Sequence, residues 1–583
     1  MSKQILNNFI YGATDKNILG RTELKAYNQS ASIIENFKLN SLGGLSRREG
    51  LTEVLRTTTR TRLIAFSYSS DLSFLLIFED KQLRIINTIT HDQIGEPIET
   101  EYSAEELAEI QYAQNEDSLF LTHIDHPVYI LEYAGDSFAF SKFKANCDDE
   151  NPHLFEEEND YPSVVALCSN RLYLASSRNK PFTIWVSKSF DPTNFWTYKV
   201  GTSTTSRQAT TDEYISQFEK WKANELTTVT KTYTTWEIEL KQTNWWKERV
   251  EVEGGGDASK ISIAYTDLLA TNTSLFTEVM TIYETEETQV YTDENAMILE
   301  LASSKNDKIT FINILHNIIV GTRSSEWIIP YDITPSSLKA TKESSYGSTF
   351  LASLNMQTEL IFFQNSGVIR SMKYDYANYN YPCEDITIFN KEILEKGIVE
   401  CATQSVPVAK LFCICKDGTL AVMTRNELDN TFGWVKYKTE IGNFISIAVA
   451  DVNGEQRVYC VIDNSKISEE LTYITCFFDK TKLNDLDEYS FISKFESNPI
   501  ETTTYQTLDN TKYGWSIGLR VFDTNEFKGG FSNSPLKIAD ATKTDIVTLP
   551  VPTSWSKDLR IKVESIEDNP LNISAILMNI GVV

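Results

Sequence analysis

The residues best suited to chemistry lie in the sequence HIDH, which contains His123, Asp125 and His126. Imidazole and carboxylate groups at this spacing are ligands for a divalent metal. In an extended strand His123 and Asp125 share one face, whereas His126 points to the other and Pro127 ends the strand. The chain holds only five histidines, so a complete metal site is hard to assemble. We therefore expect a hairpin turn here, and no metal.

The eight cysteines are scattered along the chain and form no CxxC pair. Cys413 and Cys415 are two residues apart, which places them on one face of a strand. A metal site would need two more ligands from elsewhere, so the expectation is buried free thiols.

Motifs for catalysis are absent from the sequence. It contains no phosphate-binding loop, no GxGxxG and no GxSxG nucleophile elbow. A glycosidase needs two carboxylates about 5–10 Å apart, and with 81 Asp and Glu residues the sequence does not exclude such a pair. We expect no enzyme activity and no cofactor.

One basic stretch stands out, LGGLSRREG, with Gly43, Gly44, Arg47 and Arg48. One interpretation is a tight turn whose arginines pair with nearby acids. The other is a contact with another subunit, because the planar guanidinium group binds carboxylates through two hydrogen bonds. These four residues are the candidate contact site.

Composition and charge narrow the class of protein. The chain has 583 residues, 41% hydrophobic, and its 27 Tyr and 30 Phe favour β structure. A net charge of −27 argues against a protein that grips nucleic acid through phosphates, yet it suits a wall that nucleic acid passes without sticking. No signal peptide or membrane-length apolar run is present, so we expect synthesis and assembly in a cytoplasm.

Short apolar runs recur along the chain, each followed by a polar turn and a second apolar run. They begin at Phe74, Leu119, Leu172, Ile318, Leu360, Leu411 and Val458. Most intervals are about 45–50 residues, which is the length of a four-stranded propeller blade. One interval is longer by about a hundred residues, which predicts an insertion between the third and fourth units. We expect a β-propeller-like body of six or seven blades; a pair of β-sandwiches is the alternative.

The insertion, residues 200–305, is expected to be a small α+β domain. TTDEYISQFEKWKAN predicts a helix because three aromatic residues recur at helical spacing, namely Tyr214, Phe218 and Trp221. Two alternating strands follow, TTWEIELKQTNWW and RVEVEGGGDASKISIAY, and the second contains a flexible turn at 254–256.

A second short helix is expected at SAEELAEIQYAQN, where Ser103 and Glu106 have the spacing of a capping box. The remaining boundaries follow from the repeats. Residues 1–199 form the first part of the propeller-like body with a segment that faces a partner, 306–480 form its second part, and 481–583 form a β region that closes it.

The stretch GRTELKAYNQSASIIENFKLNSLGGLSRREGLTEV resembles the opening of the tail nozzle proteins, also called tail tubular protein B, of short-tailed podovirus-type bacteriophages. Further resemblances follow in order: RLIAFSYSSDLSFLLIFEDKQLRI, YSAEELAEIQYAQNEDSLFLTHIDHPVYIL, NRLYLASSRNKPFTIWVSKSFDPTNF, HNIIVGTRSSEWII and KDGTLAVMTRNELDNTFGWVKYKTE. Together they cover about residues 20–200 and 310–465. Glu49 departs from the family, which usually has proline at that position.

The resemblance implies a largely β, propeller-like protein that forms a ring of six copies below the head-to-tail adaptor. Such a ring closes the tail channel, retains the genome and opens for ejection. Its partners would be further copies of the chain, the adaptor or portal proteins, tail fibres or spikes, the host surface, and genomic double-stranded DNA that passes without specific binding. The location would be the virion tail, and Arg47 and Arg48 would contact the adaptor.

Two other classes of function stay open. The chain could be an interaction protein on an ordinary propeller scaffold, or a tail protein that binds or hydrolyses host glycans.

Overall fold

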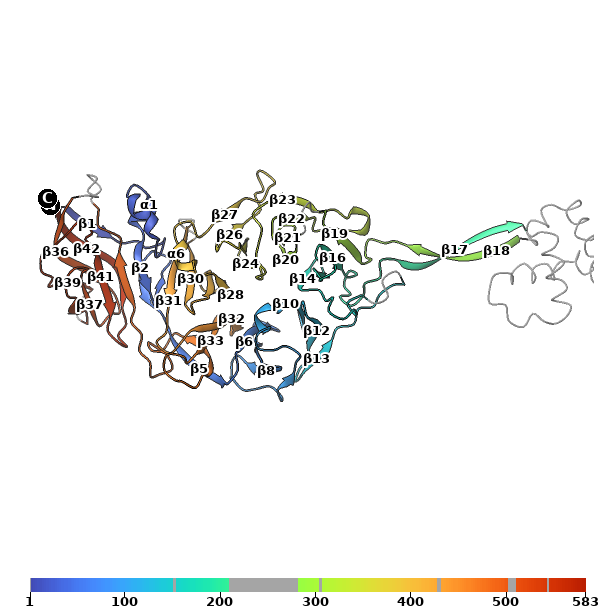
Figure 1. The fold of residues 1–583 in the computed structure, drawn as a ribbon, viewed down its shortest axis with the longest axis horizontal. Coiled ribbons are helices and arrows are strands. Elements are labelled where there is room, and N and C mark those ends of the chain that lie inside the picture. Colours follow the sequence, from blue (N-terminus) through green and yellow to red (C-terminus); the bar gives the residue numbers. More distant parts are fainter. Residues whose placement is uncertain are drawn as a thin grey trace, which may run out of the picture. The chain divides into compact units, whose positions relative to one another are not determined.

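The computed structural model describes residues 2–149, 154–208, 281–302, 307–426, 431–501, 510–542 and 545–582. These residues are mostly β (Figure 1). Contacts divide the chain into two units, of which the first comprises Met1–Phe195 and Ala296–Val583 and the second Trp196–Asn295.

The first unit is a β-propeller of four-stranded blades. Six blades are separate sheets, and a seventh set of four strands begins a nine-stranded sheet. Blade 1 consists of β6 (Arg62–Ser67), β7 (Ser73–Glu79), β8 (Gln82–Asn87) and β9 (Ile98–Glu99), and blade 2 of β10 (Gln111–Asn115), β11 (Ser118–His123), β12 (His126–Tyr133) and β13 (Phe138–Lys142). Blade 3 consists of β14 (Val164–Cys168), β15 (Arg171–Ala175), β16 (Thr183–Val186) and β19 (Met297–Glu300). Blade 4 consists of β20 (Ile309–Ile314), β21 (Ile318–Thr322), β22 (Glu326–Ile329) and β23 (Thr341–Ser344). Blade 5 consists of β24 (Leu354–Met356), β25 (Glu359–Phe363), β26 (Ile369–Met372) and β27 (Cys383–Asp385). Blade 6 consists of β28 (Ile398–Gln404), β29 (Lys410–Cys415), β30 (Leu420–Asn426) and β31 (Thr431–Tyr437). Blade 7 consists of β32 (Phe444–Val452), β33 (Glu455–Asp463), β34 (Tyr473–Asp479) and β5 (Gly50–Thr57).

The seven apolar runs of the sequence are the second strands of the seven blades. A second strand has a neighbouring blade on each of its two faces, so both sets of side chains are buried. Every residue of β7, β15, β21 and β25 is buried accordingly. A continuous apolar run is the pattern of such a strand, and the prediction of a propeller-like body of four-stranded units is confirmed.

Separate apolar clusters join each blade to the next and close the ring. Side chains of β7 show the alternation, because Phe74 and Leu76 pack with blade 2 whereas Leu75 and Ile77 pack with blade 7. The other clusters join blades 2 and 3, 3 and 4, 4 and 5, 5 and 6, and 6 and 7. Alternate side chains of a strand point to opposite faces, so one strand serves two interfaces.

The seventh blade takes its outer strand from the beginning of the chain. β5 pairs antiparallel with β34, with Gly50 opposite Asp479. The propeller therefore closes by hydrogen bonds between two distant parts of the sequence.

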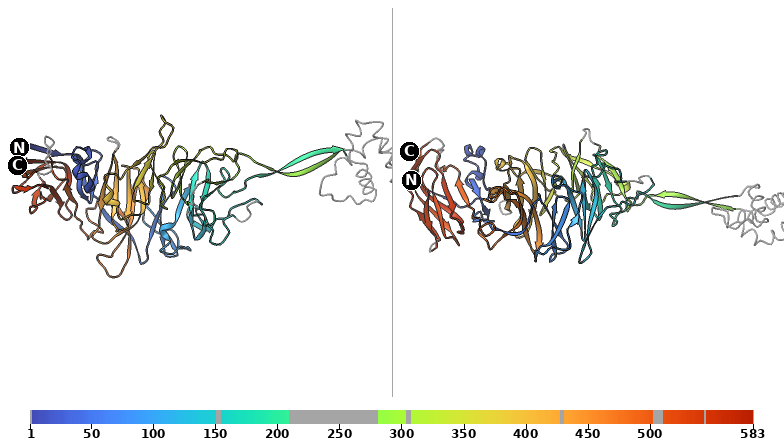
Figure 2. Two further views of the ribbon diagram at one scale, coloured as in Figure 1. Left: turned by 45° about the horizontal axis from the view of Figure 1, so that its top comes forward. Right: turned by 60° about the horizontal axis from the view of Figure 1, so that its bottom comes forward.

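A β-sandwich adjoins blade 6 and combines both ends of the chain. One layer has β3 (Phe37–Leu39), β4 (Leu45–Arg47), β42 (Asn572–Val582), β36 (Lys512–Val521) and β39 (Ile546–Leu549), joined by β1 (Ser2–Leu6) and β40 (Ser554–Ser556). The other extends the sheet of blade 6 through β2 (Ala31–Glu35), β35 (Lys494–Ser497), β41 (Ile561–Ser565), β37 (Glu526–Phe531) and β38 (Lys537–Asp540). Figure 2 shows the N- and C-terminal strands next to each other, in agreement with the pairing of β1 with β42.

The insertion lies inside the third blade and not between the third and fourth units. The chain leaves after β16 and returns at β19, and these two strands pair with each other. The prediction used only the distance in sequence between the second strands of consecutive blades. That distance does not show whether an insertion comes before or after the fourth strand of the earlier blade, so the insertion was placed wrongly. In the second unit, β17 (Lys199–Gln208) pairs with β18 (Thr281–Val290). The helix and strands expected between them lie outside the described residues.

Helices are few and short in the described residues: η1 (Lys16–Gly20), α1 (Lys25–Asn28), η2 (Leu107–Glu109), η4 (Pro335–Ser337) and α6 (Lys391–Leu394). The expected second helix is only the single turn η2. The capping contact exists, because the Ser103 N–H and hydroxyl both donate to Glu106 Oε2, at 2.8 and 2.7 Å. Blade 2 takes the residues after Ile110 as its first strand, which ends the helix. No helix among the described residues is long and apolar enough to cross a membrane.

Candidate functional site

Arg48 forms a buried ion pair and not a surface contact. Its Nη1 and Nη2 atoms donate to Oδ1 and Oδ2 of Asp485, at 2.9 and 2.7 Å, and both side chains are 0% exposed. The guanidinium carbon Cζ lies 3.5 Å from the ring centroid of Phe491. Every face of the side chain is thus occupied within the chain, and the prediction that Arg48 contacts an adaptor or another subunit is wrong.

Arg47 is also buried. Its Nη2 donates to the carbonyls of Leu483 and Phe491, at 2.8 and 2.7 Å, and its Nη1 donates to Ser565 Oγ at 2.7 Å. Burial, together with the charge of Arg48, lowers the pKa of Arg47 to about 10. The side chain ties β4 to the loops around blade 7 and the sandwich, so it is not available to a partner.

Gly43 and Gly44 form the turn between β3 and β4. Gly43 has a φ of +86°, and a Cβ atom there would lie 2.3 Å from Asn8 Oδ1. The interpretation as a tight turn with a paired arginine therefore holds for this stretch, and all four candidate residues serve the fold.

His123 and His126 face each other across the turn between β11 and β12. They are directly paired in the ladder, and their ring centroids lie 5.0 Å apart, so the expectation that they point to opposite faces is wrong. The difference arises because β11 ends at His123 and β12 begins at His126, so the two histidines are cross-strand partners and not members of one continuous strand.

The hydrogen bonding of His123 disfavours a metal ion on its Nε2 atom. Its Nδ1 accepts a hydrogen bond from the Asp125 N–H at 3.1 Å, so Nε2 carries the proton in the neutral ring. Among the described residues, no group of three His, Cys, Asp or Glu side chains has the geometry of a metal site.

His123 should make the protein less stable as the pH falls from 7 to 5. Burial, reinforced by His126, lowers its pKa from 6.5 to about 4. Between these values the unfolded chain binds a proton that the folded chain does not, so stability decreases with pH by on the order of 1 kcal/mol. Urea unfolding at several pH values should show a shallower decrease in the His123→Asn variant.

The exposed His316 provides the matched control, and His316→Asn should keep the wild-type slope. The range from pH 7 to 5 lies above the pH at which the neighbouring Glu106 carboxyl becomes protonated. Burial alone would raise the pKa of Glu106, but hydrogen bonds from Ser103 and His126 lower it to about 2, so its contribution is lost only at lower pH. Equal slopes in wild type and His123→Asn would contradict the prediction.

The cysteines are free thiols, as expected for Cys413 and Cys415, which are both buried in β29. Cys413 lies opposite Cys401 of β28, with 3.5 Å between the sulfur atoms. Burial raises the pKa of Cys415 to about 11, so this thiol is a poor nucleophile.

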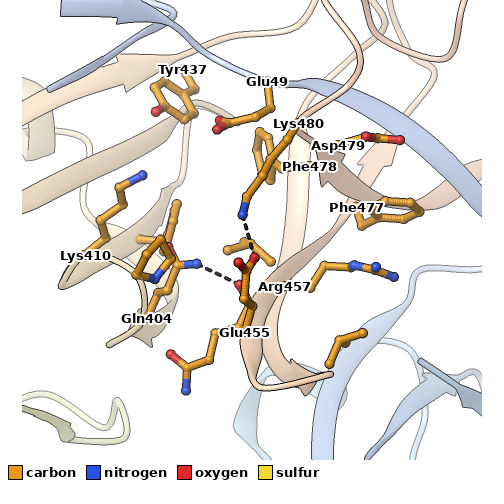
Figure 3. A pocket seen from close by; sticks show the side chains of 15 residues that line it. Glu49, Gln404, Lys410, Tyr437, Glu455, Arg457, Phe477, Phe478, Asp479 and Lys480 are labelled. Atoms are coloured by element: carbon orange, nitrogen blue, oxygen red, sulfur yellow. Dashed lines mark hydrogen bonds and ion pairs between the residues drawn. The ribbon is translucent and has the colours of Figure 1, made fainter. Parts of the chain in front are cut away.

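A cavity of about 230 Å³ lies between blades 6 and 7. Blade 6 contributes Gln404, Lys410 and Tyr437, whereas blade 7 contributes Glu455 and Lys480 (Figure 3). The site was not found from the sequence, because its walls come from separate blades. The one local signal is Lys410 itself, a lysine that begins the apolar strand KLFCIC.

Most polar groups around this cavity have partners in the chain. Lys480 Nζ lies 2.5 Å from Glu455 Oε2, and Gln404 Nε2 donates to the Gln456 carbonyl at 2.8 Å. Glu49 accepts a hydrogen bond from Lys38 Nζ at 2.7 Å.

Two groups differ. In the part of the chain that the structure describes, the Lys410 ammonium group has no ion pair within 4.0 Å and the Tyr437 hydroxyl has no hydrogen bond. Figure 3 accordingly draws dashed lines at Lys480 and Gln404 but none at Lys410 or Tyr437.

Exposed aromatic side chains gather in the loops of one face of the propeller. Successive strands of a blade are antiparallel, so the loops between strands one and two and between strands three and four all lie on the same face. We call this the aromatic face; it carries Tyr68, Phe190, Tyr331, Tyr376 and Tyr379.

Contacts between neighbouring loops support this placement. The Phe190 N–H donates to the Asn170 carbonyl at 2.8 Å within blade 3, and Ser169 Oγ donates to the Tyr331 carbonyl of blade 4 at 3.0 Å. Tyr376 and Tyr379 of blade 5 are 72% and 81% exposed. Aromatic residues are enriched at protein interfaces, so this face has the composition of a binding surface.

Comparisons with known proteins give distant structural similarity only. No protein-family model matches the chain, and no curated protein sequence matches it. Solved structures similar to it include the Neurospora crassa Pan2 WD40 domain (8% identity, 74% of this chain and 97% of that chain, TM-score 0.34) and the WD40 repeats of RRP9 (6% identity, 74% and 99%, TM-score 0.37). Chaetomium thermophilum Raptor is similar at 9% identity over 74% of this chain and 29% of that chain, with a TM-score of 0.37.

Proposed function

We propose that this chain is a structural, non-enzymatic protein that works by binding other protein subunits on a β-propeller scaffold. The aromatic face carries this proposal. Tyrosine offers a large, rigid contact area at a low cost in side-chain entropy, because only two torsions need to be fixed. Exposed aromatic side chains in water are unfavourable unless a partner covers them.

In its more specific form, the proposal is that the chain is the tail nozzle subunit of a short-tailed phage. The support is the ordered resemblance along residues 20–200 and 310–465, together with a net charge of −27. A ring of such chains would repel the phosphates of DNA and let the duplex pass. Because Arg47 and Arg48 are buried, the contact with an adaptor must use other residues.

Native mass spectrometry and negative-stain imaging of the purified chain test the proposal. We expect a ring of six copies with a central channel. The double variant Tyr376→Ser/Tyr379→Ser should need at least ten-fold more protein to assemble, because two exposed aromatic contacts are lost.

Tyr291 is 60% exposed in the second unit, so Tyr291→Ser is the matched control and should assemble like wild type. A wild-type monomer at tens of micromolar would refute the ring, and normal assembly of the double variant would refute the role of the aromatic face. A monomer that binds or cleaves a bacterial surface polysaccharide would instead support the glycan function.

A further inference from the structure

We propose that the cavity between blades 6 and 7 is a carboxylate-binding site in which Lys410 supplies the cation and Tyr437 supplies a hydroxyl donor. Both residues line the cavity, and neither has a polar partner among the described residues. The Tyr437 ring also lies 5.9 Å from Cζ of the buried Arg48.

The position of Lys410 favours an incoming anion. Burial lowers the pKa of its ammonium group, and the positive charges of Lys38 and Lys480 lower it further, while Glu49 acts in the opposite direction. Glu49 forms its ion pair with Lys38, at 2.7 Å, and among the described residues no carboxylate lies within 4.0 Å of the Lys410 ammonium group. Lys410 is partly buried, and a cation that has lost part of its hydration without gaining a partner is unfavourable, so an anion that reaches it lowers that cost.

Tyr437 supplies the second donor. Its side chain is 2% exposed, and its ring lies 6.0 Å from that of Phe478. Burial raises the pKa of its hydroxyl, so the group stays protonated and can only help an anion as a hydrogen-bond donor. A charged acceptor forms a stronger hydrogen bond with such a group than a neutral one does.

The other charges of the wall select the kind of anion. Besides Arg457 and Lys480, which pairs with Glu455, the wall holds the carboxylates of Glu49, Glu455 and Asp479. These carboxylates would repel a phosphate dianion more strongly than a singly charged group. A volume of about 230 Å³ is smaller than the cavities that hold drug-sized molecules. The site therefore suits one carboxylate on a short aliphatic stem.

Such a carboxylate has two possible sources, a free small carboxylic acid or the Glu or Asp side chain of a partner protein. The second source rests on the proposed binding function, whereas the first does not. The experiment therefore needs one probe of each kind.

Isothermal titration calorimetry of the full chain with butyrate, with the peptide acetyl-Gly-Glu-Gly-amide and with inorganic phosphate tests the site. We expect saturable binding of butyrate, of the peptide, or of both, and at least ten-fold weaker binding of phosphate. Lys410→Met should weaken carboxylate binding at least ten-fold, and Tyr437→Phe should weaken it several-fold. Lys528 is exposed on β37, so Lys528→Met is the matched control and should bind like wild type.

The thermal midpoint of each variant shows whether it folds. Lys410→Met removes an unpaired, partly buried charge, so its midpoint should equal or exceed that of wild type. Binding of butyrate alone identifies a free acid as the ligand, and binding of the peptide identifies a protein side chain. The proposal is overturned if neither carboxylate binds, if phosphate binds as tightly, or if folded Lys410→Met binds like wild type. Ring assembly is measured separately, so its failure remains distinguishable from failure of this site.

Discussion

Replacing Asp485 with asparagine is expected to lower the free energy of unfolding by about 3–5 kcal/mol, which is the usual cost of breaking a buried ion pair. The reason is that Arg48, which is 0% exposed, would exchange two hydrogen bonds to a carboxylate for at most one to a neutral amide oxygen, and would face an NH2 donor at the other position. Urea unfolding followed by tryptophan fluorescence measures the change.

Two variants separate the ion pair from its surroundings. The double variant Arg48→Met/Asp485→Leu removes both charges and should recover much of the lost stability, since buried ion pairs are often replaceable by apolar side chains. Arg56→Met breaks an exposed pair with Glu53 and should cost less than about 1 kcal/mol. If Asp485→Asn were no more harmful than Arg56→Met, the buried pair would not stabilise the junction of β4 and blade 7.

Trp434→Ala is expected to cost about 3–5 kcal/mol, because it removes a large core side chain and leaves a cavity. Trp434 lies in β31, is 0% exposed and packs in the cluster that joins blades 5 and 6. Its indole N–H donates to the Ile386 carbonyl at 2.9 Å, and that carbonyl would lose its partner. Guanidinium unfolding at constant pH provides the measurement.

Trp555 is the matched control, since it is the same residue type at 55% exposure. Trp555→Ala should change the stability by less than about 1 kcal/mol, as is usual for surface substitutions. Trp434→Phe should fall between the two, because it keeps apolar volume and loses only the indole hydrogen bond. Equal effects at the two tryptophans would show that Trp434 is not part of a closely packed interface.

The propeller could be predicted from the sequence because burial on two faces leaves a continuous apolar run. FLLIF at Phe74 and LFCI at Leu411 are such runs, and each is the second strand of a blade. The fourth strand of blade 3, β19, is only four residues long and alternates buried and exposed residues, so it was not recognised, and the position of the insertion relative to it could not be seen.

The site residues were harder to predict, because charge alone does not show where a side chain lies. Arg48 pairs with Asp485 across 437 residues of sequence, so nothing near LGGLSRREG reveals the partner. The same applies to Lys410 and Glu455, which meet only because blades 6 and 7 pack together. Ser103 and Glu106 were correctly recognised as a local capping pair, yet pairing of β10 with β11 prevented the longer helix.

The closing strand of the propeller sets the order in which the chain can fold during translation. Thr52 of β5 donates to Asp479 of β34 across 427 residues, so β5 leaves the ribosome long before its partner is made. Contacts of such separation form slowly, and an unpaired strand edge invites association with other chains. A nascent chain therefore carries β5 without its partner through most of its synthesis, as it does β1 and β4, which pair with β42, and the circle is completed only as the last blade emerges.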